Sequence, residues 1–375
     1  MKICHNPFRA LSFLSFATTN QHDSTATTST TTTSTMKRVD LVKVGDIIPH
    51  QNIVQVDTDI PKPKPDHSEV LIDIAATAIN PVDWKMAVMG VFLPDDLPAT
   101  LGCDIAGTVE VGPDDLKGKR VATYLPANKA DSKTSRGAFV EKVVVERDVV
   151  FEIPDGMSFA EASTLPLAAL TGVLLADALV GMKAGDWVLI WGASSSVGFN
   201  AVQLAKRRGW RVIAVASGKH EKVLTEDLGA DAFVDYRKDD VGSKVAAIML
   251  EAAAAKKAGD GEDDRGKLNG AMDCIGTAES FTPSANLVDR FGDEALKKQP
   301  KQTGLLVVST VNPFVMPTPP DGVKMDQVNM VFILEDAATR KAIIESSPSI
   351  FELKTSPILS VKGDVSAETV CKALK

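Results

Sequence analysis

A turn of glycine and serine residues, Gly-Ala-Ser-Ser-Ser-Val-Gly at 192–198, joins an apolar run to a segment with helical apolar spacing. In such a turn, backbone N–H groups and the positive end of a helix dipole meet at one point and stabilise a diphosphate. The residues expected to bind a dinucleotide there are Gly192, Ser194, Ser195, Ser196, Val197 and Gly198. A glycine usually fills the middle of this pattern, so the three serine hydroxyls are expected to add hydrogen-bond donors. The alternative is an ordinary crossover in another kind of α/β protein, because a glycine-rich turn alone is a weak signal.

The residues after the second apolar run indicate which dinucleotide fits. NAD usually meets a carboxylate there, which accepts from the ribose 2′-hydroxyl, whereas a 2′-phosphate needs cations and donors. This chain has Ser217, Lys219 and His220 at that place. Tyr236 and Arg237 follow a third apolar run and can add a hydroxyl and a guanidinium. The pattern therefore predicts NADPH as the cofactor; the alternative is that Lys219 and Arg237 are ordinary surface charges.

These residues need a strand, a turn, a helix and a second strand to position them. The runs at 187–191 and 212–216 consist of apolar residues, as is typical of parallel strands buried on both faces. Between them, apolar residues recur at helical spacing from Val197 to Ala205, and Gly209 stops the helix. The whole unit has the length that a Rossmann dinucleotide-binding fold requires.

The composition is that of a globular protein long enough for two domains, with 375 residues, 44% hydrophobic and 24% charged. A net charge of −8 and the lack of a dense Lys/Arg cluster argue against nucleic acid or an anionic membrane as the main partner. No apolar run approaches the roughly 18 residues of a membrane span. The cysteines, at positions 4, 103, 274 and 371, have no metal-ligand spacing, so we expect no metal site and reduced, intracellular thiols.

Residues 1–35 differ from the rest of the chain. They are rich in Ser and Thr and contain Asp23 as their single acidic residue. Such a leader resembles an organelle transit peptide, for a mitochondrion or plastid, and is expected to be disordered. The alternatives are a disordered tail, or translation that begins at Met36, with the protein in the cytoplasm.

The remaining chain divides by pattern. Residues 36–160 are rich in alternating segments, such as 70–75 and 104–111, and predict a compact, partly closed β-domain. Helical patterning begins near Ser158, where Glu161 completes a capping signature. Strands and helices then alternate to residue 309, which predicts a nucleotide-binding domain over 161–310. A proline-rich stretch after it is expected to mark the exit, with 311–375 returning to the first domain.

Seven motifs occur in the order seen in one known family. They are Asn80-Pro-Val-Asp-Trp-Lys85, Gly102 to Gly107, Gly137 to Glu141, Leu165 to Thr171, Trp191 to Gly198, Leu228 to Tyr236, and Asp273 to Gly276. In this order the chain resembles the medium-chain dehydrogenase/reductases, and most of all their zinc-independent branch of quinone oxidoreductases and fungal trans-acting enoyl reductases. The resemblance covers about residues 40 to 310. It implies an α/β protein with a GroES-like catalytic domain and a doubly wound Rossmann domain.

The resemblance also implies which residues act. Lys85 and Thr171 would lie beside the nicotinamide, with Asn80 and Asp83 as ordering groups. Zinc-dependent relatives carry a cysteine at the stretch that is Asn80 to Asp83 here, so no zinc is expected. Each residue also has a purely structural interpretation: Asn80-Pro opens a turn that Asp83 caps, Lys85 lies at the surface, and Thr171 bonds within its helix.

Without a metal, hydrogen-bond donors must stabilise the oxygen on which negative charge develops. A conjugated carbonyl compound suits this chemistry, because hydride addition to its β-carbon spreads the charge over an enolate. The sequence therefore predicts an NADPH-dependent oxidoreductase that reduces α,β-unsaturated carbonyl compounds, such as enones or enoyl thioesters. The alternatives are a quinone oxidoreductase on the same scaffold and a non-catalytic NADPH-binding protein. A homodimer through the edge of the nucleotide-binding sheet, as in relatives, stays open.

Overall fold

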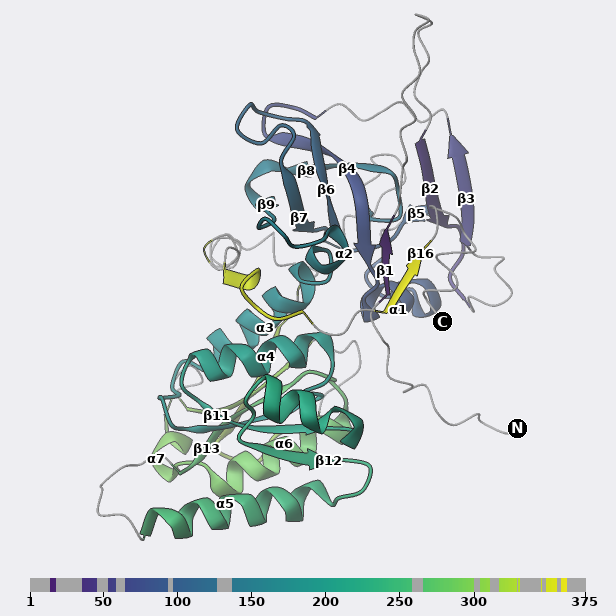
Figure 1. Ribbon diagram of the computed structural model, residues 1–375. Helices are drawn as coiled ribbons and strands as arrows, with labels where there is room; N and C mark the ends of the chain where they lie inside the picture. Colours follow the sequence, from purple (N-terminus) through teal and green to yellow (C-terminus); the bar gives the residue numbers. More distant parts are fainter. Residues whose placement is uncertain are drawn as a thin grey trace, which may run out of the picture. The chain divides into compact units, whose positions relative to one another are not determined.

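The computed structural model describes residues 14–17, 36–45, 53–58, 65–93, 97–126, 137–257, 266–299, 304–310, 317–328, 330, 345, 349–355 and 359–362. The chain forms two compact units. We call the first the β-rich unit; it comprises Met1–Leu167 and Met330–Lys375. The second, the α/β unit, comprises Ala168–Asn329. Figure 1 shows the strands of the first unit and the layered helices and sheet of the second.

The α/β unit contains a six-stranded parallel sheet with the strand order β12-β11-β10-β13-β14-β15. Its strands are β10 (Trp187–Trp191), β11 (Arg211–Ala216), β12 (Ala232–Asp235), β13 (Leu268–Asp273), β14 (Leu305–Thr310) and β15 (Val323–Val328). The first strand, β10, lies inside the sheet, and the order runs outward from it in both directions. In an open parallel sheet, ligands bind at the carboxyl ends of the strands where the order reverses. Here that switch point lies at the end of β10.

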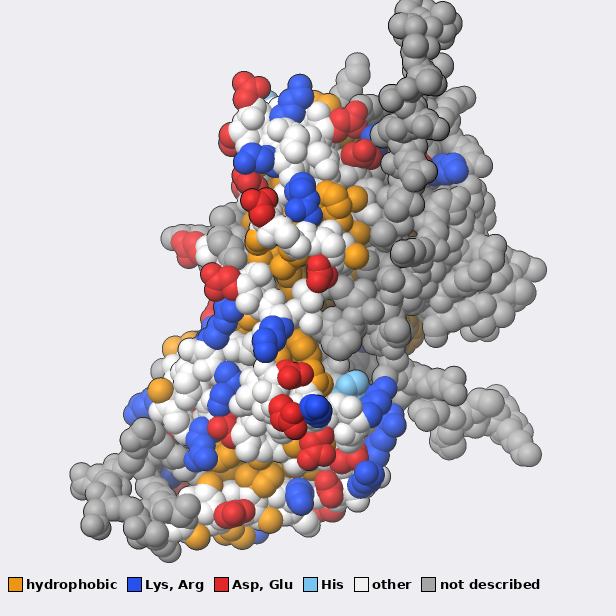
Figure 2. All heavy atoms as spheres, in the orientation of Figure 1, with side chains coloured by type: hydrophobic (Ala, Val, Ile, Leu, Met, Phe, Trp, Pro, Cys, Tyr) orange, Lys and Arg blue, Asp and Glu red, His pale blue; other side chains and the backbone are white. Residues whose placement is uncertain are grey.

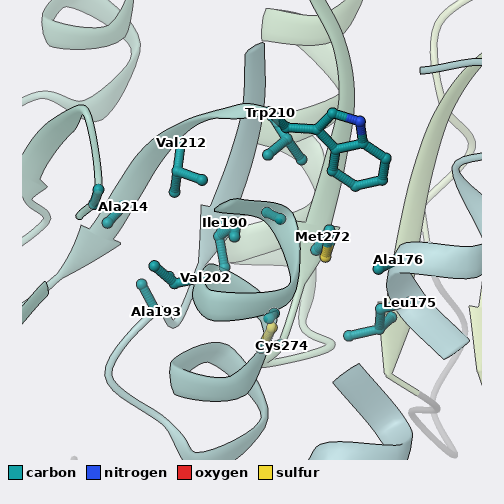
Figure 3. Close-up of a cluster of buried hydrophobic side chains, with 14 of the residues drawn as sticks. Leu175, Ala176, Ile190, Ala193, Val202, Trp210, Val212, Ala214, Met272 and Cys274 are labelled. Atoms are coloured by element: carbon teal, nitrogen blue, oxygen red, sulfur yellow. The ribbon is translucent and has the colours of Figure 1, made fainter. Parts of the chain in front are cut away.

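Helices cover both faces of this sheet. They are α3 (Pro166–Ala178), α4 (Ser196–Arg207), α5 (Val241–Lys257), α6 (Ala278–Phe291) and the short α7 (Glu294–Lys297). Ile190 and Val212 belong to one buried cluster, which includes Leu175 of α3 and Val202 of α4 (Figure 3). Their neighbours in sequence belong to a second cluster, with residues of α5 and α6. Successive strand residues face opposite layers, and both layers are apolar, which explains the apolar runs and confirms the strands and helix predicted at 187–216.

The β-rich unit holds a seven-stranded sheet, β16-β1-β4-β6-β7-β9 with β8 paired to β4, and a three-stranded sheet, β3-β2-β5. The strands are β1 (Leu14–Ala17), β2 (Met36–Leu41), β3 (Ile53–Thr58), β4 (Glu69–Ala78), β5 (Ala99–Thr100), β6 (Asp104–Val111), β7 (Arg120–Tyr124), β8 (Lys142–Glu146), β9 (Phe151–Glu152) and β16 (Leu359–Lys362). The helices are α1 (Pro81–Met89) and α2 (Phe159–Ala162). Ser158 accepts the N–H of Glu161 at the start of α2, so the predicted capping box is confirmed.

Part of the leader belongs to this sheet. Residues 14–17 form β1, which pairs antiparallel with β4 and parallel with β16. The expectation of disorder over 1–35 therefore fails for these four residues, because two neighbouring strands supply the hydrogen bonds that the segment cannot make alone. The rest of the leader lies outside the described residues. Within the described part of the chain, no helix has the length and apolarity to cross a membrane.

The limits of the α/β unit differ from those expected at 161 and 310. The unit begins at Ala168, within α3, and continues to Asn329. Beyond the proline-rich stretch, β15 pairs in parallel with β14 and adds a sixth strand to the sheet. This stretch therefore connects two strands of one sheet, and interpreting it as the exit from the domain was wrong.

Candidate functional site

The turn after β10 has the geometry of a dinucleotide-binding loop. Gly192 adopts a φ of +75°, in the left-handed region that favours glycine. The N–H groups of Gly192 and Ala193 donate to the carbonyl of Val215 on β11, at 3.0 and 3.1 Å. These bonds fix the turn against the neighbouring strand, and α4 begins directly after it at Ser196.

Gly198 allows α4 to lie close to this turn. A Cβ atom at position 198 would lie 2.1 Å from the carbonyl oxygen of Gly192 and 2.7 Å from the Cα of Ala193. Any side chain there would therefore push the helix away from the strand end. The glycine at this position is required by the close backbone approach.

The three serines of the turn have different environments. Ser195 is the N-cap of α4, and its hydroxyl accepts the N–H of Gly198 at 3.0 Å. The hydroxyl of Ser196 is buried, without a hydrogen-bond partner among the described residues. Ser194 is half-buried in the turn. The oxygen of Ser195 thus serves the helix start as an acceptor. Its O–H hydrogen can still be donated, so the prediction that the three hydroxyls are additional donors to a diphosphate stays a prediction.

The turn fits a diphosphate. The first N–H groups of a helix have no intrahelical acceptor, and here Gly198 gives its N–H to Ser195. The N–H groups of Ser196 and Val197 receive no acceptor from the described part of the chain. Together with the buried, unpartnered Ser196 hydroxyl, they form donors at the positive end of a 12-residue helix. The sequence correctly predicted a helix that begins at this turn, since the signals lie close together in the chain. That these residues bind the diphosphate stays a prediction.

Cationic side chains gather where β11 and β12 end. Ser217 is buried and begins a short 3-10 helix, Gly218–His220. Lys219 is exposed there and His220 is half-buried. Burial lowers the pKa of the His220 imidazole, and the charges of Lys219 and Arg237 lower it further. The tertiary structure thus brings these three side chains close enough for their charges to interact, and Figure 2 shows Lys and Arg side chains beside a histidine on this unit.

Tyr236 lies at the same edge of the sheet. The residue is 46% exposed, and its hydroxyl accepts from Nε of Arg237 at 3.3 Å. The Arg237 guanidinium lies 5.7 Å from the centre of the ring. Asp235, just before it, is buried and directed inward: one of its carboxylate oxygens accepts the N–H of Arg237, and the other lies against Gly218. The proximity of Asp235 to Gly218 was not visible in the sequence, since the two are 17 residues apart, one at the end of β12 and the other in the 3-10 helix after β11.

In the β-rich unit, a buried polar cluster surrounds the start of α1. The backbone N–H of Asn80 donates to the Asp83 carboxylate at 2.6 Å, and the Asn80 side chain donates to Asp104 at 2.8 Å. Cys103 donates its S–H to the other oxygen of Asp83 at 3.5 Å. Asp104 also accepts the N–H of Leu167 at 2.9 Å. Sequence reasoning identified Asn80 and Asp83 but not Asp104, whose signal was an acidic residue among the small and apolar residues of the motif at 102–107.

Burial dominates the electrostatics of this cluster. It raises the pKa of Asp83 to about 7, against the opposing effect of the hydrogen bonds from Asn80, Cys103 and Gly102. Burial also raises the pKa of Asp104, and the nearby Asp83 adds to that rise. The pKa of the Cys103 thiol is raised well above its usual value by burial and by both carboxylates. The thiol is therefore a hydrogen-bond donor here and not a nucleophile.

Lys85 and Thr171 belong to different units. Lys85 is half-buried on α1, and burial lowers the pKa of its ammonium group. Thr171 is buried on α3, in the α/β unit. The cluster around Asn80 holds the start of α1, five residues before Lys85, so the sequence motif Asn80 to Lys85 forms one local structural element.

Comparison with known proteins relates both units to one family. The family model "Alcohol dehydrogenase GroES-like domain" matches residues 66–155, and the model "Zinc-binding dehydrogenase" matches residues 196–296. The trans-enoyl reductase himH of Aspergillus japonicus is 31% identical over 297 residues, which cover 75% of this chain and 81% of that protein. The chain belongs to the medium-chain dehydrogenase/reductase superfamily, in its enoyl-reductase-like branch.

A second relative in this superfamily matches a shorter region at higher identity. The trans-enoyl reductase tazE of Aspergillus terreus is 38% identical over 198 residues, 49% of this chain and 65% of its own length. The chain thus spans less than two thirds of that relative. Among solved structures, the quinone oxidoreductase of Escherichia coli complexed with NADPH shares the fold, with a TM-score of 0.63, 20% identity, and coverage of 84% of this chain and 87% of that one.

Membership of the medium-chain dehydrogenase/reductases confirms the predicted fold class, a GroES-like domain with a Rossmann-type domain. The matched residues 66–155 include α1 and the Asn80 cluster, and the matched residues 196–296 include α4 and the ends of β11 and β12. Among the residues that the structure describes, no three His, Cys, Asp or Glu side chains gather as a metal site would require.

Proposed function

We propose that this medium-chain dehydrogenase/reductase is an NADPH-dependent enzyme that reduces the activated double bond of an α,β-unsaturated carbonyl compound. The similarity to the trans-enoyl reductase himH, over 81% of that protein, carries the proposal. The dinucleotide turn and the cationic residues at the ends of β11 and β12 support its cofactor. The structural similarity to an NADPH complex is consistent with it.

The residues of the α/β unit fit NADPH. We assign the diphosphate to the N–H groups of Ser196 and Val197 at the start of α4, and the 2′-phosphate to Lys219, His220 and Arg237. A guanidinium and an ammonium suit a phosphate dianion, and a half-buried imidazole adds a donor. When bound, NADPH supplies the hydride that is transferred to the β-carbon of the substrate.

Lys85 and Thr171 would act on the oxygen of the substrate. An ammonium group whose pKa is lowered by burial is a stronger acid than an exposed lysine. Aimed at the carbonyl oxygen, Lys85 would stabilise the negative charge that develops there, as preorganised donors do in metal-free sites. The Thr171 hydroxyl would be a second donor. These roles need no zinc ion, in agreement with the expectation from Asn80 to Asp83.

Turnover by the purified full chain tests this function. The protein is mixed with NADPH, then with a small enone, a crotonyl thioester or a quinone in separate reactions, and NADPH absorbance is followed. Consumption with the enone or thioester is the expected result. Consumption with the quinone alone would make the chain a quinone oxidoreductase, and tight NADPH binding without turnover would make it a non-catalytic nucleotide-binding protein. Stoichiometric zinc in elemental analysis would overturn the metal-free mechanism.

We also propose that the enzyme forms a homodimer through β15. This strand lies at the end of the strand order of its sheet and pairs, among described strands, with β14 only. An edge strand presents backbone N–H and C=O groups that a second copy can pair with. Light scattering after size exclusion measures the mass directly, and the mass of a single chain would contradict this proposal.

The predicted intracellular location stays a proposal, in the cytoplasm or in an organelle. A fusion of residues 1–35 to a fluorescent protein distinguishes the two. Because β1 lies within this leader, the fusion is compared with the full chain carrying the same label at its C-terminus.

A further inference from the structure

Asp104 connects two helix starts from a buried position. One carboxylate oxygen accepts from the Asn80 side chain, which is the N-cap of α1, at 2.8 Å. The other accepts the backbone N–H of Leu167, in the first turn of α3, at 2.9 Å. Its backbone carbonyl accepts from Thr77 at 2.7 Å, at the end of β4. Asp104 is fully buried, so both carboxylate oxygens are held by the protein.

We propose that Asp104 is a positioning residue for the reaction: it fixes the start of α1 through Asn80 and thereby sets the place of Lys85. This inference rests on the proposed role of Lys85. Asn80 is held on two sides, by Asp83 at its backbone and by Asp104 at its side chain. Without the bond from the Asn80 side chain to Asp104, Asn80 would keep only its backbone bond to Asp83. The start of α1, and with it Lys85, would then be held less firmly.

The chemistry of the site argues for positioning over simple stabilisation. A buried carboxylate costs folding free energy unless it is paired, and the two groups that donate to the Asp104 carboxylate, the Asn80 side chain and the Leu167 backbone N–H, are neutral amides. An apolar residue of similar volume would satisfy the packing alone. What the carboxylate adds is direction, because its two oxygens accept from two groups at once and hold them in one geometry.

The test uses the labelling of Lys85 in the full chain, without substrate. Lysines are acetylated over a range of pH values, and mass spectrometry gives the pH midpoint of Lys85, with the exposed Lys119 as internal reference. Burial is the cause of the lowered pKa of Lys85. Loss of a negative charge near a lysine lowers the lysine pKa, so a rise of the midpoint reports greater exposure of Lys85 and not the missing Asp104 charge. A rise of the Lys85 midpoint in Asp104→Asn is the expected result. An unchanged midpoint overturns the proposal.

Asp40→Asn is the matched control. Asp40 is also fully buried in the β-rich unit, but its carboxylate bonds Thr100 and Arg38, neither of which belongs to α1. This variant is expected to be less stable and to keep the Lys85 midpoint. The same rise in both variants would show a general loosening of the unit and would overturn the proposal.

Turnover adds a second readout. Asp104→Asn is expected to lower kcat about tenfold or more while leaving the KM for NADPH within about twofold, and its effect should largely vanish in a Lys85→Met background. If the double variant instead loses kcat by the product of the two single-variant factors, the substitutions act independently, and Asp104 does not act through Lys85. Where Asp104→Asn does not fold, Asn80→Ala removes the same bond from the other side. If the wild type shows no turnover, only the proposed function is contradicted. The labelling of Lys85 still tests whether Asp104 positions this lysine.

Discussion

The Asp83 carboxylate accepts the backbone N–H of Asn80 at 2.6 Å while it lies fully buried, and burial raises its pKa to about 7. The bond holds together the two ends of the first turn of α1. The raised pKa means that this carboxyl group gains or loses its proton near neutral pH, where the enzyme would work.

Stability should therefore depend on pH through Asp83. Its folded-state pKa lies above the unfolded value of 3.8, so the stabilisation is fully present below 3.8 and is lost as the pH rises through about 7. A shift of this size corresponds to about 4 kcal/mol at most. In Asp83→Asn this pH dependence disappears, so the stability of the wild type relative to the variant should fall between pH 5 and pH 8. Denaturant unfolding at both pH values measures it, and a constant difference would contradict the raised pKa.

Replacing Lys85 should impair the chemical step. In Lys85→Met the side chain keeps its apolar length and loses its donor, and we expect kcat with an enone to fall by about 10²–10³, as for other lost donors to a developing oxyanion. NADPH binding, measured by fluorescence titration, should change little. Lys119→Met, an exposed lysine of the same unit, is the control. Equal kcat values in Lys85→Met and wild type would remove Lys85 from the mechanism.

Cofactor preference should depend on Lys219. Removing its charge in Lys219→Ala is expected to raise the KM for NADPH about tenfold or more, since a charge-assisted hydrogen bond contributes about 1.5–3 kcal/mol. The KM for NADH should stay near its wild-type value, because NADH has no 2′-phosphate. Lys222→Ala serves as the control, as that lysine is 81% exposed and pairs with Glu226. Parallel changes for both cofactors would place Lys219 away from the phosphate.

The glycine at position 198 should be intolerant of any side chain. Gly198→Ala would place a Cβ 2.1 Å from the carbonyl oxygen of Gly192, so the turn and the start of α4 must move apart. We expect NADPH affinity to fall at least about tenfold, with a lower melting temperature. Gly242→Ala, on α5 of the same unit, meets nothing nearer than 3.6 Å and should behave as wild type. Normal NADPH affinity in Gly198→Ala would refute the assigned turn.

Removal of the leader should affect folding. A chain that begins at Met36 lacks β1, which leaves β4 and β16 without a shared partner. The edges exposed in this way favour association, so we expect a lower melting temperature and more aggregation than for the full chain. Scattering during a thermal ramp compares the two. Identical melting curves would show that β1 contributes nothing to the stability of the sheet.

Elements with local signals could be predicted from the sequence. The strand, turn, helix and strand at 187–216 were predicted because apolar runs, glycines and helical spacing all occur within about 30 residues. The same is true of the capping box at Ser158 and of Asn80 and Asp83, three residues apart. The position of Lys219 and His220 directly after a strand was also predicted, and their contact with the cofactor stays a proposal.

The tertiary structure alone decided the features that join distant parts of the chain. Asp104 bonds Asn80 across 24 residues and Leu167 across 63, and no local pattern records such a pairing. Strands β1 and β15 form because neighbouring strands supply their hydrogen bonds, although a polar leader and a proline-rich stretch surround them. The Ser195 hydroxyl bonds the helix start for a similar reason. Backbone N–H groups at the end of an element need an acceptor, and the tertiary structure shows that Ser195 supplies it for Gly198.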